Sequence, residues 1–362
     1  MPKIGQEEID AVVSVMKSGM LTSSLGAGPK VSEFEKNFAA FAGVKHAIAV
    51  NTGTAALHAA LLAIQVKPGD EVILPSFTFV ATAEAAALAG AKVVFADIDP
   101  VTYTLSPSAV KQALTPKTRA IIPVDLYGLP ADTKPIKELA AKHGLTVIED
   151  CAQSHGAIYQ GKPAGAFADV ACWSLYAAKN IGTGEGGMVT SDNDELAEKV
   201  RMVRTHGEKV KYNSLILGTN YRMTEIQAAI GAVQLKRLPE FFSKRSDNAK
   251  RLTQLLEKSE RLVLPPKLDD RSPSWYLYTV RIKDATETER NRIIEAMHSK
   301  GFGAEAYYPT PVHQMPYYKQ TFGSFTLPET EKAAKQVLSL PIHPGVTTLQ
   351  IDDIAEAFLS LL

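Results

Sequence analysis

Cysteine is scarce in this chain, because the 362 residues include only Cys151 and Cys172. A disulfide-held scaffold is therefore excluded. The first residues also lack the continuous apolar stretch of a signal peptide, since acidic side chains such as Glu7 and Asp10 interrupt it. We therefore expect a cytoplasmic protein. No pair of His or Cys residues has zinc-ligand spacing, so no metal site is predicted.

The chain also lacks a surplus of charge of either sign and any long apolar run. Its 39 Lys and Arg residues balance 39 Asp and Glu residues, whereas proteins that bind nucleic acid through bulk charge need a basic surplus. The nearest approach to a membrane span, residues 85–91, is mostly alanine and far shorter than the roughly 20 residues that cross a bilayer. The sequence thus predicts no nucleic-acid partner and no membrane partner.

Short β-rich runs alternate with longer helical patterns in the first half of the chain. Most of the β-rich runs are continuously apolar, which is typical of a parallel sheet covered on both faces. The alternation of strand and helix predicts an α/β fold with right-handed crossovers. Strands are predicted at residues 46–50, 71–74, 92–96, 120–124, 145–149, 169–174 and 188–191, and helices at residues 55–65, 81–89, 106–114 and 133–143.

The pattern changes after about residue 190. Helices are predicted at residues 194–204, 224–238 and 241–258, with a polar loop at 205–220 and Pro239 between the last two helices. A smaller set follows, with strands at 276–282 and 304–308 and helices at 287–300, 329–338 and 351–361. We predict a large domain, residues 1–240, and a small α+β domain, residues 241–362. The N-terminal segment 1–25 is expected to pack on the small domain.

Polar groups suited to one ligand follow three of the predicted strands. Ligands of open parallel sheets lie beyond the carboxyl ends of the strands. The turn at residues 51–57 opens a helix and is either an anion site or a simple helix cap. Asp150 ends an apolar strand and either faces a cationic group or caps the next segment. Lys179 follows Ser174 among small residues, as a solvated surface lysine or as an amine that forms a Schiff base.

A glycine motif in the same region is misleading. Gly182, Gly184 and Gly187 have the G-x-G-x-x-G spacing of a dinucleotide site. That motif must open a helix, whereas these glycines lead into a strand-like run. We therefore reject a dinucleotide cofactor. A helix start for a phosphate, an Asp for a pyridine nitrogen and a Lys for an aldehyde are instead the parts that pyridoxal phosphate requires.

Several motifs in this order resemble those of the DegT-like nucleotide-sugar aminotransferases, within the fold type I (aspartate-aminotransferase-like) pyridoxal-phosphate enzymes. The resemblance covers nearly the whole chain. It is carried by Gly5-Gln6-Glu7-Glu8-Ile9, Gly69-Asp70-Glu71-Val72-Ile73, Pro75-Ser76-Phe77-Thr78-Phe79, Glu149-Asp150-Cys151-Ala152-Gln153, Thr183-Gly184-Glu185-Gly186-Gly187, Asn220-Tyr221-Arg222-Met223-Thr224 and Tyr307-Tyr308-Pro309 with His313. It implies a seven-stranded, mainly parallel sheet and a small C-terminal domain.

The resemblance also implies a role for each matching residue. Lys179 would be the catalytic Schiff-base lysine. Asp150 would contact the pyridine nitrogen of the cofactor, Gln153 its ring hydroxyl and Phe79 its ring face. The phosphate of the cofactor would be held by Thr54, the Ala55 backbone and Ser174. Asn220 would reach the phosphate of a partner subunit, so that a homodimer shares its active sites. His313, Tyr308 and Arg222 are candidate substrate contacts.

The implied reaction is transfer of an amino group from L-glutamate to a nucleotide-linked keto-sugar by a ping-pong mechanism. Residues 220–231 are most similar to enzymes that aminate C4 of a 4-keto-6-deoxyhexose, perosamine synthases among them. Two alternatives stay open: dehydration of a sugar with the same cofactor, and a non-catalytic regulator or binding protein on the same fold. Relatives that dehydrate carry His in place of the lysine, so Lys179 favours amino transfer.

Overall fold

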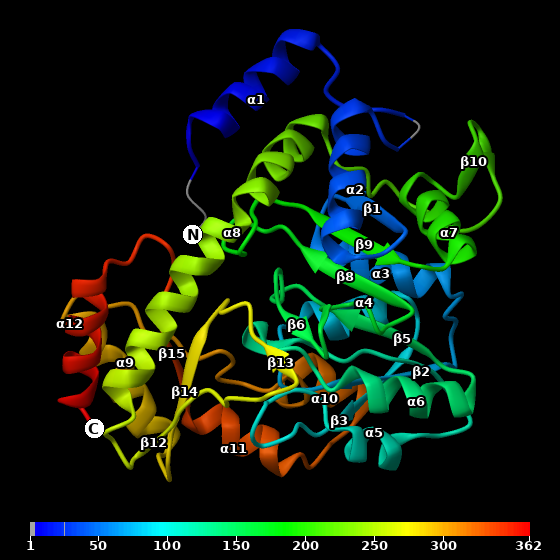
Figure 1. Cartoon of the computed structure of the whole chain (residues 1–362). Coiled ribbons are helices and arrows are strands. Elements are labelled where there is room, and N and C mark those ends of the chain that lie inside the picture. The colour runs from blue at the N-terminus through cyan, green and yellow to red at the C-terminus, as the bar shows by residue number, and fades with distance from the viewer. Residues whose placement is uncertain (1–3, 25) are drawn as a thin grey trace.

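A sheet of seven strands forms the centre of the molecule. The computed structural model describes residues 4–24 and 26–362. The strands are β1 (His46–Val50), β2 (Glu71–Pro75), β3 (Lys92–Ala96), β4 (Thr118–Ile121), β5 (Thr146–Asp150), β8 (Val170–Ser174) and β9 (Gly187–Ser191). Their order is β1-β9-β8-β5-β4-β2-β3 (Figure 1). Only β9 runs antiparallel to its neighbours in this sheet, which confirms the predicted, mainly parallel α/β fold.

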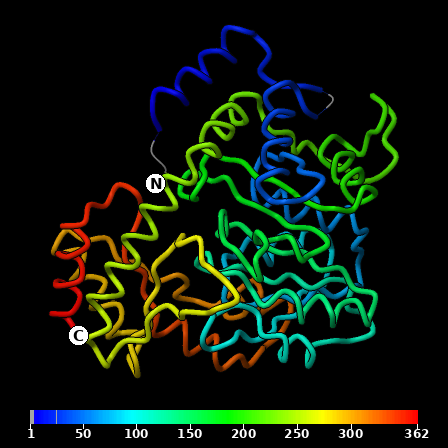
Figure 2. The backbone as a smooth tube through the Cα atoms, viewed as in Figure 1, coloured from blue at the N-terminus to red at the C-terminus, as the bar shows by residue number. Residues whose placement is uncertain are grey.

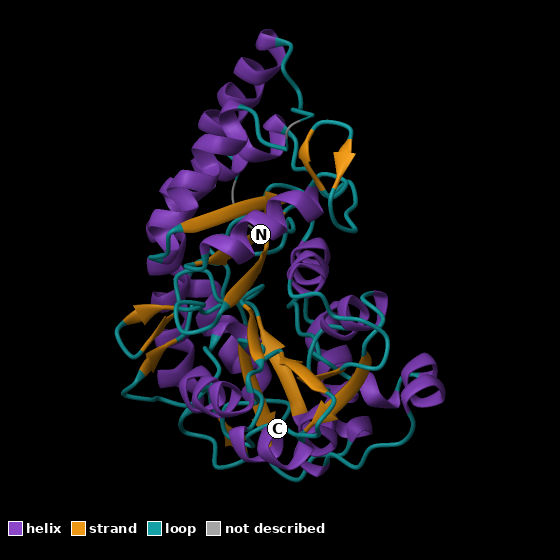
Figure 3. Cartoon of the chain, turned by 90° about the vertical axis from the view of Figure 1, so that its right-hand side faces the viewer, coloured by secondary structure: helices purple, strands orange, loops and turns teal. Residues whose placement is uncertain are grey.

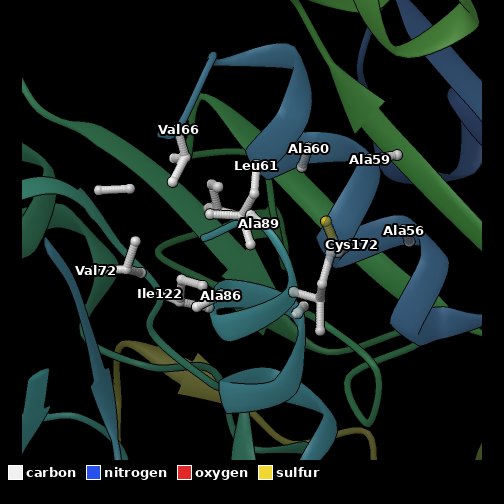
Figure 4. Close-up of a cluster of buried hydrophobic side chains, with 14 of the residues drawn as sticks. Ala56, Ala59, Ala60, Leu61, Val66, Val72, Ala86, Ala89, Ile122 and Cys172 are labelled. Atoms are coloured by element: carbon white, nitrogen blue, oxygen red, sulfur yellow. The ribbon is translucent and has the colours of Figure 1, made fainter. Parts of the chain in front are cut away.

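Helices cover both faces of this sheet and belong to the large domain. They are α2 (Pro29–Ala42), α3 (Gly53–Ala63), α4 (Ala81–Leu88), α5 (Pro107–Ala113), α6 (Thr133–His143) and α7 (Asp194–Arg204), with a short 3₁₀ turn at Leu126–Gly128. Alanines on α3 and α4 pack against the sheet residues Val72 and Cys172 (Figure 4). Because alanine is short, the helix backbones lie close to the strands. The N-terminus of α3 is thereby fixed at the carboxyl edge of the sheet.

One long helix, α8 (Glu225–Leu256), replaces the two helices predicted on either side of Pro239. The prediction of a break was wrong. Proline removes one backbone hydrogen bond from a helix, but Leu238 and Phe241 beside it are both buried, and their packing holds the helix continuous (Figure 2). The predicted boundary between residues 240 and 241 thus falls inside α8.

The second half of α8 packs on a small domain with its own core. Its sheet has the order β12-β14-β15, with β12 (Leu262–Val263), β14 (Tyr278–Ile282) and β15 (Val337–Leu340). Its helices are α9 (Glu287–Ser299), α11 (Pro328–Gln336) and α12 (Thr348–Leu359). A 3₁₀ turn at Val312–Gln314 and α10 (Pro316–Phe322) precede α11 and pack on the core of the large sheet beside β3. The predicted strand at 304–308 is wrong, because that segment makes only a single bridge between Glu305 and Ser339. The predicted helix at 329–338 ends early because Val337 and Leu338 join the sheet.

The N-terminal helix was not predicted, and neither was its site of contact. Helix α1 (Gln6–Ser18) packs on the first half of α8, where the buried Glu8 accepts hydrogen bonds from Gln234 (2.6 Å) and Arg237 (2.8 Å). These partners belong to the first half of α8, and packing of segment 1–25 on the small domain stays a prediction. Residues 1–3 and 25 of that segment lie outside the described residues.

The predicted polar loop at 205–220 contains a small hairpin. Its strands β10 (Glu208–Val210) and β11 (Asn213–Ser214) pair with each other and stand apart from the main sheet (Figure 3). A further small sheet joins β6 (Ile158–Tyr159), β7 (Lys162–Pro163) and β13 (Arg271–Ser272). Within residues 4–24 and 26–362, we find no helix whose length and apolar character would suit a membrane span.

Candidate active site

The start of α3 and the end of β8 meet in a tight cradle. A Cβ atom added to Gly53 would lie 2.7 Å from the Cβ of Ser174, so only glycine permits this approach. Thr54 and Ala55 follow in the first turn of α3, whose N–H groups and dipole favour an anion. Thr52 caps the helix by accepting a hydrogen bond from the Ala55 N–H (3.0 Å). A phosphate at the Ala55 N–H would therefore share or replace that bond.

Asp150 ends β5 and is buried at the same edge of the sheet. Its carboxylate accepts hydrogen bonds from the Thr82 hydroxyl (2.9 Å) and the Ala152 N–H (3.1 Å). Thr82 is in turn held by Thr78 at 3.0 Å. Burial raises the pKa of Asp150, and its hydrogen bonds and the positive charge of Lys179 oppose that rise. A fixed carboxylate in such a place is suited to pair with a buried cation.

Lys179 lies in the loop that follows β8 and is partly buried. The Nζ atom stands 4.5 Å from the centre of the Tyr276 ring. Burial lowers the pKa of Lys179 to about 8, although Asp150 favours the charged form. About one amine in ten is then uncharged at pH 7, as a nucleophile requires. The surface-lysine interpretation is not supported by this environment.

Gln153, Phe79 and Tyr308 line the space beside Asp150. The Gln153 side chain accepts a hydrogen bond from the Tyr127 N–H (2.7 Å) and donates one to the Tyr308 hydroxyl (3.3 Å). Phe79 is 57% exposed, which is unusual for a large apolar ring, and its centroid lies 6.1 Å from that of Tyr308. An exposed aromatic face over a polar floor is suited to stack on a planar ligand.

This set of groups fits pyridoxal phosphate. The cradle at Gly53 and Ser174 is suited to the phosphate, the buried Asp150 to the pyridine nitrogen, and the amine of Lys179 to the aldehyde. The exposed ring of Phe79 is free to cover the face of the cofactor. The three segments come from the ends of β1, β5 and β8, as expected for an open α/β sheet.

The chain is similar to known proteins over almost its whole length. Residues 2–359 match the DegT/DnrJ/EryC1/StrS aminotransferase family. The chain belongs to this family. Two relatives are a pleiotropic regulatory protein of Geobacillus stearothermophilus, 41% identical over 96% of this chain and 94% of that one, and GDP-perosamine synthase of Caulobacter vibrioides, 40% identical over 100% and 97%. The crystal structure of S. venezuelae DesV superposes with a TM-score of 0.91 at 38% identity, over 97% of this chain and 93% of that one.

Membership in the DegT/DnrJ/EryC1/StrS family confirms the predicted family and fold type. It also identifies the chain as an aminotransferase of a pyridoxal-phosphate-dependent family.

Asn220 and Arg222 lie on a loop that is attached to β1 of the same chain. The Asn51 N–H donates to Tyr221 (2.9 Å), the Asn51 side chain donates to the Asn220 carbonyl (3.4 Å), and Arg222 forms a bridge with Val50. The Asn220 residue itself is exposed. Its predicted reach to a partner subunit stays a prediction.

His313 is placed differently from a free substrate contact. It is only 3% exposed, its Nδ1 atom lies 2.7 Å from the Ser76 hydroxyl, and its Nε2 atom lies 3.5 Å from Glu331. The residue therefore links Glu331 of α11 to Ser76 at the end of β2. A contact between His313 and the substrate stays a prediction.

Sequence reasoning missed Tyr276 and a buried acidic cluster. Tyr276 comes from the beginning of the small domain, and no motif placed it beside Lys179. Ligand atoms of Asp125, Glu149 and Cys151 lie within 4.8 Å of one another, and all three residues are buried. Burial raises the pKa of both carboxyls, that of Asp125 to about 6, so the pair retains a proton near neutral pH. Successive side chains of a strand point to opposite faces, so Glu149 of β5 faces away from Asp150. This alternation is the signal from which the acidic cluster could have been predicted.

Proposed function

We propose that this protein is a pyridoxal-phosphate-dependent aminotransferase that moves an amino group from L-glutamate to a nucleotide-linked keto-sugar. A 4-keto-6-deoxyhexose, aminated at C4, is the favoured acceptor. The observation that carries the proposal is the placement of Lys179 and Asp150 in one site beside the Gly53–Ser174 cradle. The relationship to a GDP-perosamine synthase, at 40% identity, supports the sugar acceptor.

The residues of the site have distinct tasks in this reaction. Bound pyridoxal phosphate would supply an electron sink and a carrier for the amino group. Asp150 would hold a proton at the ring nitrogen, because a carboxylate in a shielded site favours the protonated pyridine. Gln153 and Tyr308 would orient the ring hydroxyl, and Phe79 would exclude water from one face. Lys179 would carry a proton from the donor carbon to the C4′ carbon of the cofactor in the first half of the cycle, and from C4′ to the sugar carbon in the second half.

The two other candidate functions are less well supported. A dehydratase of this family would carry His where this chain has Lys179. A regulator has some support from the Geobacillus stearothermophilus relative, whose name is regulatory. A regulator without catalysis, however, has no need of an amine with its pKa lowered to about 8 beside a buried Asp150. We therefore favour amino transfer.

A substrate screen tests the proposal directly. The purified protein, loaded with pyridoxal phosphate, is incubated with L-glutamate and a panel of nucleotide-linked keto-sugars, and product masses are followed. We expect an amino-sugar product of a 4-keto-6-deoxyhexose together with 2-oxoglutarate. Loss of water from the sugar without amino transfer would favour the dehydratase. No turnover of any keto-sugar by a protein that binds the cofactor would support the regulator.

Shared active sites in a homodimer are a separate prediction, which a subunit-mixing experiment tests. Inactive Lys179→Ala protein is mixed with Asn220→Ala protein, which we expect to be severely impaired. If Asn220 acts across the dimer, each mixed dimer has one intact site, and about a quarter of wild-type activity should return at equal mixing. If Asn220 serves its own subunit, both sites of a mixed dimer stay defective. Asn213→Ala is the matched control and should retain activity, because Asn213 is also exposed but lies in the hairpin.

A further inference from the structure

The position of Tyr276 beside Lys179 has no counterpart among the predicted site residues. The amine of Lys179 stands over the face of the Tyr276 ring, 4.5 Å from its centre. The face of an aromatic ring attracts a cation, and the attraction is stronger where water is excluded. Tyr276 thus stabilises the protonated amine in a place where burial destabilises it.

The backbone around Tyr276 is fixed from several sides. The buried Ser274 donates from its N–H to Gly128 (2.8 Å) and from its hydroxyl to the carbonyl of Gln153 (2.7 Å). Its own carbonyl accepts a hydrogen bond from the side chain of Asn180 (3.0 Å), the residue next to Lys179. Both the Gln153 loop and the Lys179 loop are therefore attached to the segment that carries the ring.

A second anchor comes from α8. The buried Arg245 donates through Nη1 to the carbonyls of Trp275 and Tyr276, at 3.1 Å each. Any Cβ on Gly128 would lie 2.3 Å from the Ser274 hydroxyl and 3.0 Å from the Tyr276 nitrogen, so the backbones are in direct contact. The backbone that carries the Tyr276 ring is therefore fixed relative to the loop that carries Lys179.

The charged and titratable groups around this pair divide into two sets. Asp150 from β5 favours the charged form of Lys179, and His155 is kept neutral because burial and Lys179 lower its pKa to about 3. Arg245 opposes the rise that burial causes in the pKa of the Tyr276 phenol. Tyr307 and Tyr308 have pKa values raised by burial and by Tyr276. Near neutral pH the tyrosines are uncharged, so the ring face and Asp150 are the stabilising groups at the amine.

We propose that Tyr276 is a positioning residue that holds the Lys179 amine, whenever it is not bonded to the cofactor, on its ring face within reach of the reacting carbon. This inference deepens the proposed function and rests on it for the role of Lys179. The aromatic face is the essential feature, and the hydroxyl is not. A residue that only filled space would be replaceable by any apolar side chain of similar size.

The test measures the pKa of the Lys179 amine in the full-length protein after removal of the cofactor. Acylation of Lys179 by an amine-selective reagent is followed across pH by peptide mass spectrometry. In Tyr276→Leu, we expect the apparent pKa to fall by about half to one and a half pH units, the range that a cation–aromatic contact gives. In Tyr276→Phe it should stay at the wild-type value. Tyr276→Met provides the same comparison if the leucine variant does not fold.

Tyr307→Leu is the matched control, because it removes a neighbouring, partly buried ring that packs edge-on against Tyr308. The pKa of Lys179 should not change in this variant. An unchanged value in Tyr276→Leu, or an equal fall in Tyr276→Phe, would overturn the inference. In the loaded protein, the pH profile of kcat should shift in Tyr276→Leu and be restored in Tyr276→Phe. If wild-type Lys179 fails to join pyridoxal phosphate, the proposed function fails, while the acylation comparison still decides the role of Tyr276.

Discussion

Lys179→Ala should bind pyridoxal phosphate without a covalent link and lose amino transfer by several orders of magnitude. The cradle at Ser174 and the carboxylate of Asp150 remain in this variant, so the cofactor keeps its non-covalent contacts. The amine that would join the aldehyde and move the proton is gone, and both steps depend on it. Absorption spectra and single-turnover measurements with L-glutamate follow the two effects separately.

Borohydride reduction identifies the lysine involved. In the wild-type protein it should abolish the visible absorption band and fix the cofactor to the peptide that contains Lys179. Lys162→Ala is the control, because Lys162 is an exposed lysine that also lies over an aromatic ring, that of Phe167 at 5.3 Å. That variant should behave as wild type. A cofactor label on a peptide other than that of Lys179 would refute the site assignment.

Asp150→Asn should have the second-largest effect, a loss of several orders of magnitude in kcat with the fold retained. The amide oxygen of asparagine can still accept from the Ala152 N–H, and its NH₂ group then faces the Thr82 hydroxyl, which can accept a hydrogen bond instead of donating one. The substitution keeps the shape of the side chain and removes the negative charge that would keep the pyridine nitrogen protonated. Turnover is measured together with the free energy of unfolding, so that a loss of activity is separated from a loss of stability.

The Asp150→Asn variant tests the charge of this side chain separately from its shape. Asp70→Asn is the matched control, because Asp70 also accepts a backbone N–H, that of Lys67 at 3.1 Å, but lies at the beginning of β2. We expect no change in kcat for that variant. Near-normal turnover in Asp150→Asn would mean that this residue is a cap for the segment that follows and has no part in the chemistry.

The parts of the fold and site that could be predicted are those with local signals. Short β-rich runs, most of them continuously apolar, marked all seven strands of the large sheet. The polar residues predicted at the ends of β1, β5 and β8 lie at the same edge of that sheet. Lys179 was predicted to be reactive from its small neighbours, and its lowered pKa agrees with this. These features depend on residues close together in sequence.

The parts that could not be predicted depend on contacts between distant residues. Pro239 predicts a helix end, but buried Leu238 and Phe241 on either side override the lost hydrogen bond. The segment at 304–308 has the composition of a strand, yet it forms a single bridge, through Glu305, and Tyr308 at its end contacts Gln153 of the large domain. Tyr276 reaches Lys179 from almost a hundred positions away, and no periodicity in the sequence reports such a contact.

Helix α8 has a mechanical consequence for the chemistry. Its 32 residues make a rod about 48 Å long, with one end seated on α1 and α2 and the other in the core of the small domain. Pro239 removes one hydrogen bond partway along the rod and leaves it softest at that point. Beyond that point Arg245 grips the carbonyl of Tyr276. Ser274 connects the same segment to Gln153 and to Asn180, the neighbour of Lys179. The far half of the rod and the loop of Lys179 therefore share one anchor, the segment that carries Tyr276.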